Sequence, residues 1–419
     1  MKFTTLRQVL DYIENKTNFQ LGILRVEKFL KQANIPFENL NYIHVGGTNG
    51  KGSVSYYLSN ILIESGYKVG MFSSPSIEKH NDRIRINNEF IPDEAIIDFV
   101  NEYYEIIEQT EVTMFEIDVL MALDYFAKNK VEYVVMEVGM GGRFDGTNVI
   151  MPLFSIITNI GVDHQTYLGN DKLEIAYNKA GIIKKDNLVI TGEKDKKCLK
   201  VIEDYALKMN AQVIETNIPE IVSLRPIIFN YNNYNNIELK TLADYQIKNS
   251  MIVLEAVNVL KNKYQMPIKD EVIKDVFKKK TWNGRFEIMS ANPLIIIDGA
   301  HNVEGVKELT SSIMKFSEYK KTIMFAALED KATDEMVSML IDTNSEVVIS
   351  EFDFYRTKKA IDINKNFNLE IALNYQEYLN EKIVKMKSDE MLIITGSLYF
   401  ISEIRKFLIN TLNLGEKVL

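Results

Sequence analysis

The segment HVGGTNGKGS at residues 44–53 places several glycines, two hydroxyl side chains and one lysine between two apolar segments. Tyr42–Val45 has the length and apolar character of a buried strand, and apolar residues recur at helical spacing from Val54 until Gly66. A glycine-rich turn between a strand and a helix directs backbone N–H groups and a helix N-terminus at one point, which favours a phosphate group. Lys51 adds a mobile cation, and the hydroxyls of Thr48 and Ser53 can reach phosphate or a bound magnesium ion.

The segment departs from the standard Walker A pattern. Val45 occupies the position of the first glycine, and Gly52 follows Lys51 where a serine or threonine is usual. A glycine-rich surface turn is the alternative interpretation. It accounts poorly for a lysine and two hydroxyls between a strand and an amphipathic helix, so we expect a nucleotide-phosphate loop.

Two further polar residues follow predicted strands. Glu137 ends the apolar run VVMEV, where a carboxylate is well placed to hold Mg²⁺, although an ordinary strand-end glutamate is the alternative. His164 follows Asp163 in a loop after another strand. A lone histidine is more often structural than a ligand, but its position at a strand–loop junction favours a functional role.

A third group lies in the segment IIIDGAHN. Asp298, three residues before His301, follows a buried strand and could accept the hydroxyls of a ribose. The alternative is a helix N-cap made by Asp298 or Asn302. Arg285 could contact a phosphate or form a salt bridge between domains. On physical grounds alone, a helical lysine such as Lys179 would be assigned to solvent.

The order of elements predicts an α/β fold with a mostly parallel sheet, because apolar strands alternate with helices. Residues 1–40 read as two helices. The predicted strands that follow cover residues 42–45, 67–72, 133–138, 154–158 and 188–191, and the predicted helices cover 93–108, 115–126, 172–183 and 246–261. Residues 215–243 read as a hairpin-like excursion with a polar turn in NYNNYNN and without chemistry.

A second strand–helix alternation starts near Arg285. Four short apolar strands are expected at Leu294–Asp298, Thr322–Ala326, Val347–Glu351 and Leu392–Thr395, with helices between them. We therefore predict two domains: a P-loop-containing, mostly parallel ATP-binding domain at residues 1–284, and a smaller, Rossmann-like α/β domain at residues 285–419.

Composition narrows the class of protein. The 419 residues carry a formal net charge of −9, which argues against a nucleic-acid-binding protein. No apolar run approaches the roughly 18 residues of a membrane span, and the N-terminal segment turns polar too early for a signal peptide. The single cysteine, Cys198, excludes an internal disulfide and suits a reducing compartment. We expect a cytoplasmic protein without nucleic-acid or membrane partners.

Seven ordered motifs resemble one family. GTNGKGS, SSP, EVGMGGRFDGTN, ITNIGVDHQTYLG, NKAGIIK, NGRFE and DGAHN occur in the order found in folylpolyglutamate and dihydrofolate synthases, a branch of the Mur ligase superfamily. The resemblance spans roughly residues 40–305. It implies an ATP-dependent ligase that forms an acyl phosphate on a folate or dihydropteroate carboxylate, which the amine of L-glutamate then attacks. ATP is a co-substrate and Mg²⁺ a cofactor, and a monomer is expected by analogy.

The resemblance also implies roles for individual positions. Lys179 matches a lysine that the family carries as a carbamate, and Asp145 matches an aspartate near the site of acyl transfer. The expected catalytic residues are Lys51, Lys179, Asp145 and His164. The expected ATP-binding residues are Gly47, Thr48, Asn49, Gly50, Lys51, Gly52, Ser53, Asn249, Arg285, Asp298 and His301. The expected metal ligands are Ser74, Glu137 and His164, and the pterin-side residues are Thr113 and Phe115.

Some positions depart from the family pattern. Tyr245 replaces the usual histidine before Gln246, and Gly146 stands where alanine is usual. Ser76 and Ala326 replace a histidine and a glycine. None of these changes removes a proposed metal ligand or the phosphate lysine, so an active enzyme is expected.

Two alternatives remain open. One is a Mur-type ligase that acts on a cell-wall or storage-polymer precursor, and the other is a nucleotide-dependent switch without ligase chemistry. The segment Thr113–Phe115 leaves open whether a folate-pathway enzyme of this kind extends folates, makes dihydrofolate or does both.

Overall fold

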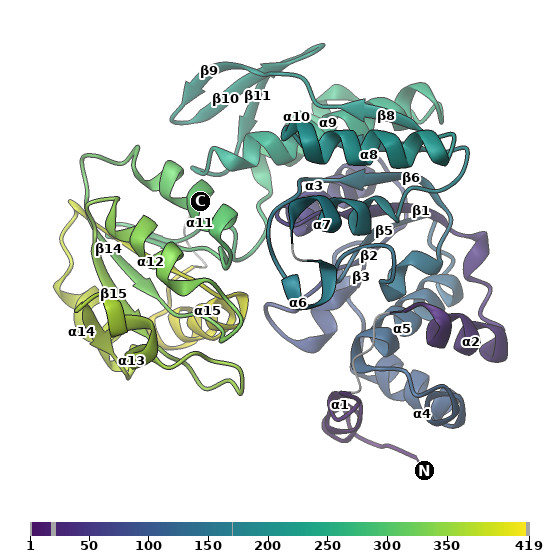
Figure 1. The fold of residues 1–419 in the computed structure, drawn as a ribbon, viewed down its shortest axis with the longest axis horizontal. Helices are drawn as coiled ribbons and strands as arrows, with labels where there is room; N and C mark the ends of the chain where they lie inside the picture. Colours follow the sequence, from purple (N-terminus) through teal and green to yellow (C-terminus); the bar gives the residue numbers. More distant parts are fainter. Residues whose placement is uncertain (1, 18–21, 170, 416–419) are drawn as a thin grey trace. The chain divides into compact units, whose positions relative to one another are not determined.

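The computed structural model describes residues 2–17, 22–169 and 171–415, which divide into two compact units (Figure 1). The first unit comprises residues 1–220, 230–237 and 248–279, and the second comprises 221–229, 238–247 and 280–419. No helix in the described ranges is long and apolar enough to cross a membrane.

An eight-stranded sheet forms the centre of the first unit, in the order β4-β3-β2-β5-β1-β6-β7-β8. The strands from β2 to β8 in this order pair in parallel, whereas β3, near one edge, pairs antiparallel with both β2 and β4. The prediction of a mostly parallel sheet is therefore confirmed. The strands are β1 (Asn41–Gly46), β2 (Val69–Phe72), β3 (Ile84–Ile86), β4 (Glu89–Phe90), β5 (Tyr133–Glu137), β6 (Pro152–Ile157), β7 (Leu188–Thr191) and β8 (Gln212–Glu215).

Both faces of this sheet are buried, which is why its central strands are mostly apolar. Val134 and Met136 pack into a cluster with residues of helices α1, α2, α4 and α5, while Val135, which points to the opposite face, is also fully buried. The helices are α1 (Leu6–Glu14), α2 (Leu24–Ala33), α3 (Lys51–Glu64), α4 (Asp93–Thr110), α5 (Met114–Lys128), α6 (Gln165–Leu168), α7 (Lys172–Ala180), α8 (Lys196–Lys208) and α10 (Asp270–Lys279).

The predicted helices of this unit are confirmed. The helices α6, α8 and α10 and the strands β3, β4 and β8 were not anticipated. Three short 3₁₀ helices, η1 (Phe37–Asn39), η2 (His80–Arg83) and η3 (Gly146–Val149), lie in loops. The register aligns Val45 with Glu137, Gly46 with Ile157 and Phe72 with Met136. The carboxyl ends of four strands, β2, β5, β1 and β6, therefore lie side by side at one edge, where α/β sheets bind ligands.

Residues 220–262 form a small sheet and a long helix. The sheet has the order β11-β10-β9, with β9 (Glu220–Leu224), β10 (Ile227–Tyr231) and β11 (Tyr234–Leu239), and helix α9 (Tyr245–Asn262) follows. The predicted hairpin is present as β10 and β11, with Asn232 in the left-handed conformation at φ 50° in its turn. The third strand, β9, was not predicted.

The second unit contains a six-stranded sheet in the order β12-β13-β17-β14-β15-β16, parallel except for β12. The four predicted strands are confirmed, and the edge strands β12 and β16 were missed. The strands are β12 (Glu287–Ala291), β13 (Leu294–Ile297), β14 (Lys320–Phe325), β15 (Glu346–Ser350), β16 (Glu370–Ala372) and β17 (Glu390–Thr395). The helices are α11 (Val303–Ile313), α12 (Thr333–Ile341), α13 (Ala360–Ile363), α14 (Tyr375–Lys385) and α15 (Leu398–Leu412), with the 3₁₀ helix η4 (Asn364–Asn366).

Truncation of a side chain in the central strand should destabilise the first unit. Ile43 in β1 is fully buried, so Ile43→Ala should lower the free energy of unfolding by about 2–5 kcal/mol through lost burial and a residual cavity. Leu207→Ala on α8 is the control, because Leu207 is 79% exposed and its loss should change stability by less than about 0.5 kcal/mol. Denaturant titration followed by circular dichroism would measure both, and equal effects would contradict the assigned core.

Candidate active site

The glycine loop after β1 is held in close contact with its neighbours. Gly47 has φ 135° and Gly50 has φ 85°, conformations that L side chains rarely adopt. A Cβ at position 47 would lie 1.9 Å from Thr158 Oγ1, and one at position 50 would lie 2.3 Å from Asn249 Oδ1. The chain then enters α3 at Lys51. Only glycine fits these two positions, and the packing brings Asn249 beside the loop.

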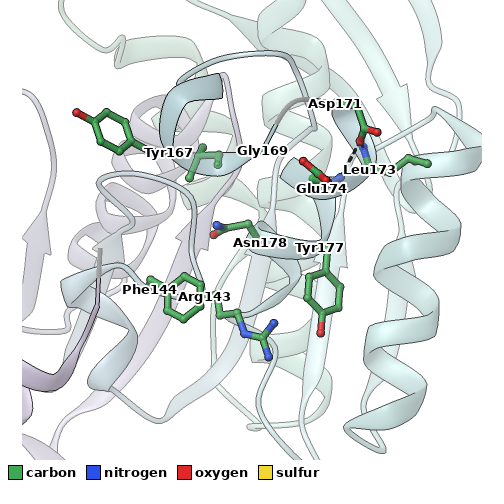
Figure 2. Close-up of a pocket in the computed structure, with 10 residues that line it drawn as sticks. Arg143, Phe144, Tyr167, Gly169, Asp171, Leu173, Glu174, Tyr177 and Asn178 are labelled. Carbon is green, nitrogen blue, oxygen red and sulfur yellow. Dashed lines mark hydrogen bonds between the residues drawn. The ribbon is translucent and has the colours of Figure 1, made fainter. Parts of the chain in front are cut away.

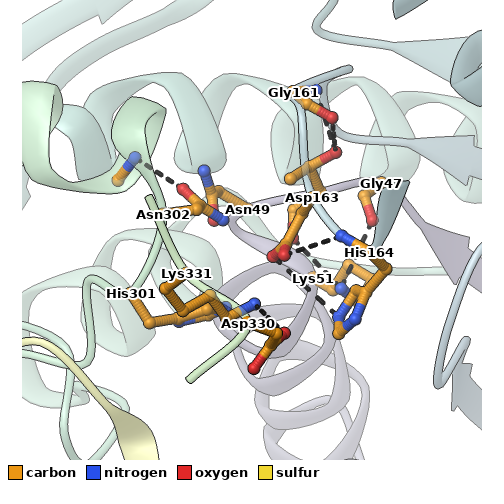
Figure 3. Close-up of polar contacts among 12 residues, drawn as sticks. Gly47, Asn49, Lys51, Gly161, Asp163, His164, His301, Asn302, Asp330 and Lys331 are labelled. Carbon is orange, nitrogen blue, oxygen red and sulfur yellow. Dashed lines mark hydrogen bonds and ion pairs between the residues drawn. The ribbon is translucent and has the colours of Figure 1, made fainter. Parts of the chain in front are cut away.

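Hydrogen bonds attach this loop to the segment that follows β6. Asn159 accepts from the backbone N–H of Thr48 at 3.0 Å and from that of Asn49 at 3.0 Å. Thr158 Oγ1 donates to the carbonyl of Asn49 at 2.6 Å. The hydroxyl of Thr48 donates to the carbonyl of Gly161 at 3.1 Å and accepts from its N–H at 2.9 Å (Figure 3). In this structure, Thr48 therefore fixes the loop rather than presenting a free hydroxyl.

Two lysine side chains converge on one carbonyl of the loop. Lys51 Nζ donates to the carbonyls of Gly47 at 3.3 Å and Thr48 at 3.1 Å (Figure 3), and Lys179 Nζ donates to that of Gly47 at 2.8 Å. Lys179 is only 4% exposed, and burial, followed by the charge of Lys51, lowers its pKa to about 7. A large share of Lys179 is thus a neutral amine at neutral pH. On the sequence pattern alone, this lysine was assigned to solvent, whereas the structure buries it.

Carboxylates surround this pair of lysines. Asp163 and Asp145 both raise the pKa of Lys179 through their charges, which oppose the effect of burial. Asp163 also accepts from the N–H of His164 at 2.9 Å, and His164 adopts φ 52° at the start of α6 (Figure 3). Asp163 was not among the predicted site residues. The signal available was its place directly before His164 in a loop after a buried strand.

The predicted metal ligands lie at the same edge of the sheet. Glu137 ends β5, is 3% exposed and is in register with Val45 of β1. Ser74 follows β2, which pairs with β5. The described residues contain no cluster of three or more histidine, cysteine or acidic side chains that could hold a metal by itself. A serine hydroxyl and one carboxylate nevertheless suit Mg²⁺, which prefers oxygen ligands and usually retains several waters. His164 supplies nitrogen, which this ion favours less.

Asp145 is held by its own loop. It caps η3, and its carboxylate accepts from Met140 N at 2.8 Å and Thr147 N at 3.0 Å and from the hydroxyl of Thr147. Burial raises the pKa of Asp145, and these hydrogen bonds lower it. The ring of Phe115 packs on this loop, since a Cβ at Gly139 would lie 2.3 Å from Phe115 Cζ. The predicted pterin-side phenylalanine thus contacts the loop that carries Asp145.

Thr113 has a structural partner. It caps α5: its hydroxyl accepts from Glu116 N at 3.4 Å, and its own backbone N–H donates to Glu116 Oε2 at 2.8 Å, which together form a capping box. Glu116 is also paired with Arg25 at 3.0 Å. Thr113 therefore stabilises the start of the helix that presents Phe115.

An open pocket of about 570 Å³ lies beside Arg143 and Phe144 of the 140–145 loop, against α6 and α7 (Figure 2). The guanidinium of Arg143 lies 4.9 Å from the centre of the Tyr177 ring and 5.7 Å from that of Phe144. This pocket was not predicted from the sequence. It is lined by Arg143, Phe144, Tyr167, Leu168, Gly169, Asp171, Leu173, Glu174, Tyr177 and Asn178.

In the second unit, Asp298 organises the end of β13. Its carboxylate accepts from Tyr245 Oη at 2.6 Å, Phe286 N at 2.8 Å and Ala300 N at 2.8 Å, and only 3% of the residue is exposed. Burial raises its pKa, and the tyrosine hydroxyl lowers it. The three protein donors leave Asp298 engaged in holding these loops together.

The neighbours of Asp298 have partners in the same unit. Arg285 Nη1 donates to the carbonyl of Gly299 at 3.2 Å, and His301 Nδ1 lies 2.8 Å from the same oxygen. Asn302 caps α11 by accepting from Gly305 N at 2.8 Å (Figure 3), which confirms the N-cap alternative for Asn302 and not for Asp298. The structure thus groups Arg285, Asp298 and His301 in the second unit.

Comparisons with known proteins follow the same division. Residues 45–257 match the Mur ligase middle domain, and residues 284–398 match the Mur ligase glutamate ligase domain. The chain is 33% identical to a dihydrofolate synthase/folylpolyglutamate synthase of Bacillus subtilis over 96% of this chain and 99% of that protein. It is 31% identical to a folylpolyglutamate synthase of Lacticaseibacillus casei, over 92% of this chain and 94% of that protein.

A solved structure agrees with these sequence matches. The folylpolyglutamate synthase of Thermotoga maritima superposes with a TM-score of 0.82 and 30% identity, over 96% of both chains. The resemblance inferred from the seven motifs is confirmed along nearly the whole chain. The chain belongs to the folylpolyglutamate synthase/dihydrofolate synthase family of the Mur ligase superfamily.

Proposed function

We propose that this protein is an ATP-dependent ligase that joins L-glutamate to a reduced folate, to dihydropteroate or to both, releasing ADP and phosphate. One observation carries the proposal: at the glycine loop that precedes α3, the side-chain nitrogens of Lys51 and of Lys179 on α7 both donate to the carbonyl of Gly47. Such a loop suits phosphate binding. The glycine loop and the two lysines lie at the ligand-binding edge of the sheet, where they could stabilise the charge that develops during phosphoryl transfer.

The chemistry has two steps. The carboxylate of the pterin substrate attacks the γ-phosphorus of ATP, a P–O bond forms, and ADP leaves. The amine of L-glutamate then attacks the acyl phosphate, a C–N bond forms, the C–O bond to phosphate breaks, and a proton leaves the amine. Residues 47–53 would hold the phosphates, with Lys51 balancing charge that develops on the transferred group.

A divalent cation is part of this proposal. Ser74, Glu137 and His164 would hold it, and when bound it would offset phosphate charge. Asp145 would lie near the acyl-transfer point, with Phe115 and Thr113 on the pterin side. Asn249, Arg285, Asp298 and His301 would contact the nucleotide, which for Asp298 requires exchange of at least one of its present donors.

Lys179 is proposed to carry a carbamate. Its neutral amine attacks CO₂, an N–C bond forms and one proton leaves, which converts the neutral amine into an anion. Burial and a pKa of about 7 support this proposal, because the free amine is the reactive form. The same change would remove the repulsion between Lys179 and Lys51.

The proposal also covers the organisation of the protein. We assign the ATP-binding domain to residues 1–284 and the second ligase domain to residues 285–419. A monomer is proposed because one chain supplies all the candidate residues. The cytoplasm is the proposed location, and the free, buried Cys198 is compatible with it.

The direct test measures phosphate release from ATP with Mg²⁺ and L-glutamate, with tetrahydrofolate or dihydropteroate as the second substrate. Mass spectrometry of the product should show a gain of one glutamyl unit on one or both pterins, which also distinguishes the two activities. Phosphate release that is indifferent to both pterins would contradict the proposal and favour a cell-wall type of ligase or a nucleotide switch.

Removal of the loop lysine should abolish turnover. Lys51→Ala should lower kcat by about 10²–10³-fold, because the cation that offsets phosphate charge is lost in a water-poor site. Lys208→Ala, a change of an exposed lysine on α8, should leave kcat unchanged. A Lys51→Ala enzyme with a normal rate of phosphate release would rule out the role of this side chain.

Neutralising Glu137 should weaken the binding of Mg²⁺ at the proposed metal site. Glu137→Gln keeps the size of the side chain but removes its charge, so the Mg²⁺ concentration for half-maximal activity should rise by about tenfold or more. Glu203→Gln on α8 serves as the control, because Glu203 is exposed. Superimposable magnesium titrations for Glu137→Gln and wild type would count against Glu137 as a ligand.

Lys179 should carry activity at the expense of stability. Its folded-state pKa of about 7 lies below the ordinary value of 10.5, so the unfolded chain binds more protons between these two values and stability should rise with pH there. Lys179→Met should lack this rise, and its stability advantage over wild type should be largest below pH 7 and shrink towards pH 10. Thermal unfolding in CO₂-free buffer would measure the difference.

The activity of Lys179 variants tests the carbamate. Lys179→Ala should lose most activity and regain part of it with added short carboxylates, which can occupy the space of the carbamate. Full activity of Lys179→Ala without any added carboxylate would exclude the carbamate. Parallel stability curves for Lys179→Met and wild type would exclude the lowered pKa.

A further inference from the structure

A buried histidine in the central strand contacts the loop of Asp145 and has no part in the chemistry described so far. His44 lies in β1 between β5 and β6 and is fully buried. Its Nε2 lies 2.9 Å from Thr147 Oγ1, and Thr147 is also fully buried. The hydroxyl of Thr147 is in turn hydrogen-bonded to Asp145 Oδ1. Three side chains from a strand and a loop thus form one continuous chain of hydrogen bonds.

The direction of this chain follows from the number of protons available. Backbone N–H groups donate to both oxygens of Asp145, an arrangement that favours the ionised carboxylate. An ionised carboxylate can only accept, so the single hydroxyl proton of Thr147 is donated to Asp145. The contact between Thr147 and His44 then requires a proton on Nε2, and His44 donates. Its other ring nitrogen, Nδ1, is buried and has no hydrogen-bond partner among the residues that the structure describes, as expected for an imidazole that carries one proton.

The surroundings of His44 favour this neutral form. Burial, followed by the charge of Lys184, lowers the pKa of His44 to about 3. The ammonium of Lys184 is directed elsewhere, since it donates to the carbonyl of Asn148 at 2.7 Å. At neutral pH, His44 is therefore a fixed donor with one possible arrangement of its proton.

The rest of the carboxylate is held equally firmly. Asp145 Oδ2 accepts from Met140 N at 2.8 Å, and Oδ1 accepts from Thr147 N at 3.0 Å. Without His44, the hydroxyl of Thr147 would be free to rotate and to accept from another donor. The hydroxyl proton would then no longer be committed to Oδ1.

We propose that His44 is a positioning residue of the ligase, which as the Nε2–H tautomer directs the hydroxyl of Thr147 onto Asp145 and so fixes the orientation of that carboxylate. The inference rests on the proposed function, in which Asp145 lies near the acyl-transfer point. It predicts that His44 affects the chemical step through Thr147 and has no influence on nucleotide binding.

The tautomer is tested without any measurement of activity. The chain contains four histidines, so ¹⁵N-histidine labelling gives four pairs of ring signals, and the His44→Gln variant identifies those of His44. At pH 7, we expect one protonated nitrogen that correlates as Nε2–H and one unprotonated Nδ1. An Nδ1–H tautomer or an imidazolium would overturn the proposal, whether or not the protein proves to be a folate ligase.

Kinetics test the positioning role. His44→Met and Thr147→Val should each lower kcat by about tenfold, with the KM for ATP unchanged. His44→Gln, which keeps an N–H near the position of Nε2, and Thr147→Ser, which keeps the hydroxyl, should retain most of the rate. Because His44 acts through Thr147, the double variant should be no slower than Thr147→Val alone.

Other outcomes would contradict the inference. If His44 only supports the fold, His44→Met should lower the melting temperature while the folded enzyme keeps its kcat. Equal losses in His44→Gln and His44→Met, or additive losses in the double variant, would also contradict the relay through Thr147. If no glutamyl product forms in any sample, the proposed function fails, and the tautomer measurement still decides the hydrogen-bond chain.

Discussion

The geometry of the first unit depends on one carbonyl oxygen, that of Gly47, which receives the ammonium groups of both Lys51 and Lys179. Two cations at one acceptor repel each other, and with little water nearby the repulsion is poorly screened. The pKa of Lys179 falls to about 7 mainly because its ammonium group is buried, and the repulsion from Lys51 acts in the same direction. A phosphate group brought to this loop would meet one mobile cation and one amine whose charge is adjustable.

This arrangement requires a loop backbone that cannot move. The close approach of Gly47 to Thr158 and of Gly50 to Asn249 leaves no space for side chains, and the bonds from Asn159 fix the intervening peptides. Neighbouring loops are built in the same way: Gly139 admits the ring of Phe115, and Asp145 closes its own loop through Met140 and Thr147. Small residues and short polar caps therefore provide the rigidity that an acyl-transfer site needs.

The fold and the location of the site could be predicted from the sequence, because buried parallel strands are apolar throughout and polar residues gather where such strands end. The partners of individual side chains could not. Thr48, Thr113 and Asp298 have the residue types of ligand-binding groups, yet in the structure they bind a loop, cap a helix and join two backbone segments. Asp163 was missed because its place before His164 was the one available signal, whereas its charge acts on Lys179, which lies on another element, α7.

Two of the departures from the family pattern, Gly146 and Tyr245, have physical explanations. A Cβ at Gly146 would make its nearest contacts at 3.5 Å with Glu116 and Val26, which is ordinary van der Waals distance, so alanine and glycine are both accommodated there. Tyr245, which stands where the family usually has histidine, donates its hydroxyl to Asp298 at 2.6 Å. A tyrosine at this position keeps a donor on the buried carboxylate without adding a titrating cation near neutral pH. Tyr245 therefore gives Asp298 a hydrogen bond that does not depend on the protonation of an imidazole.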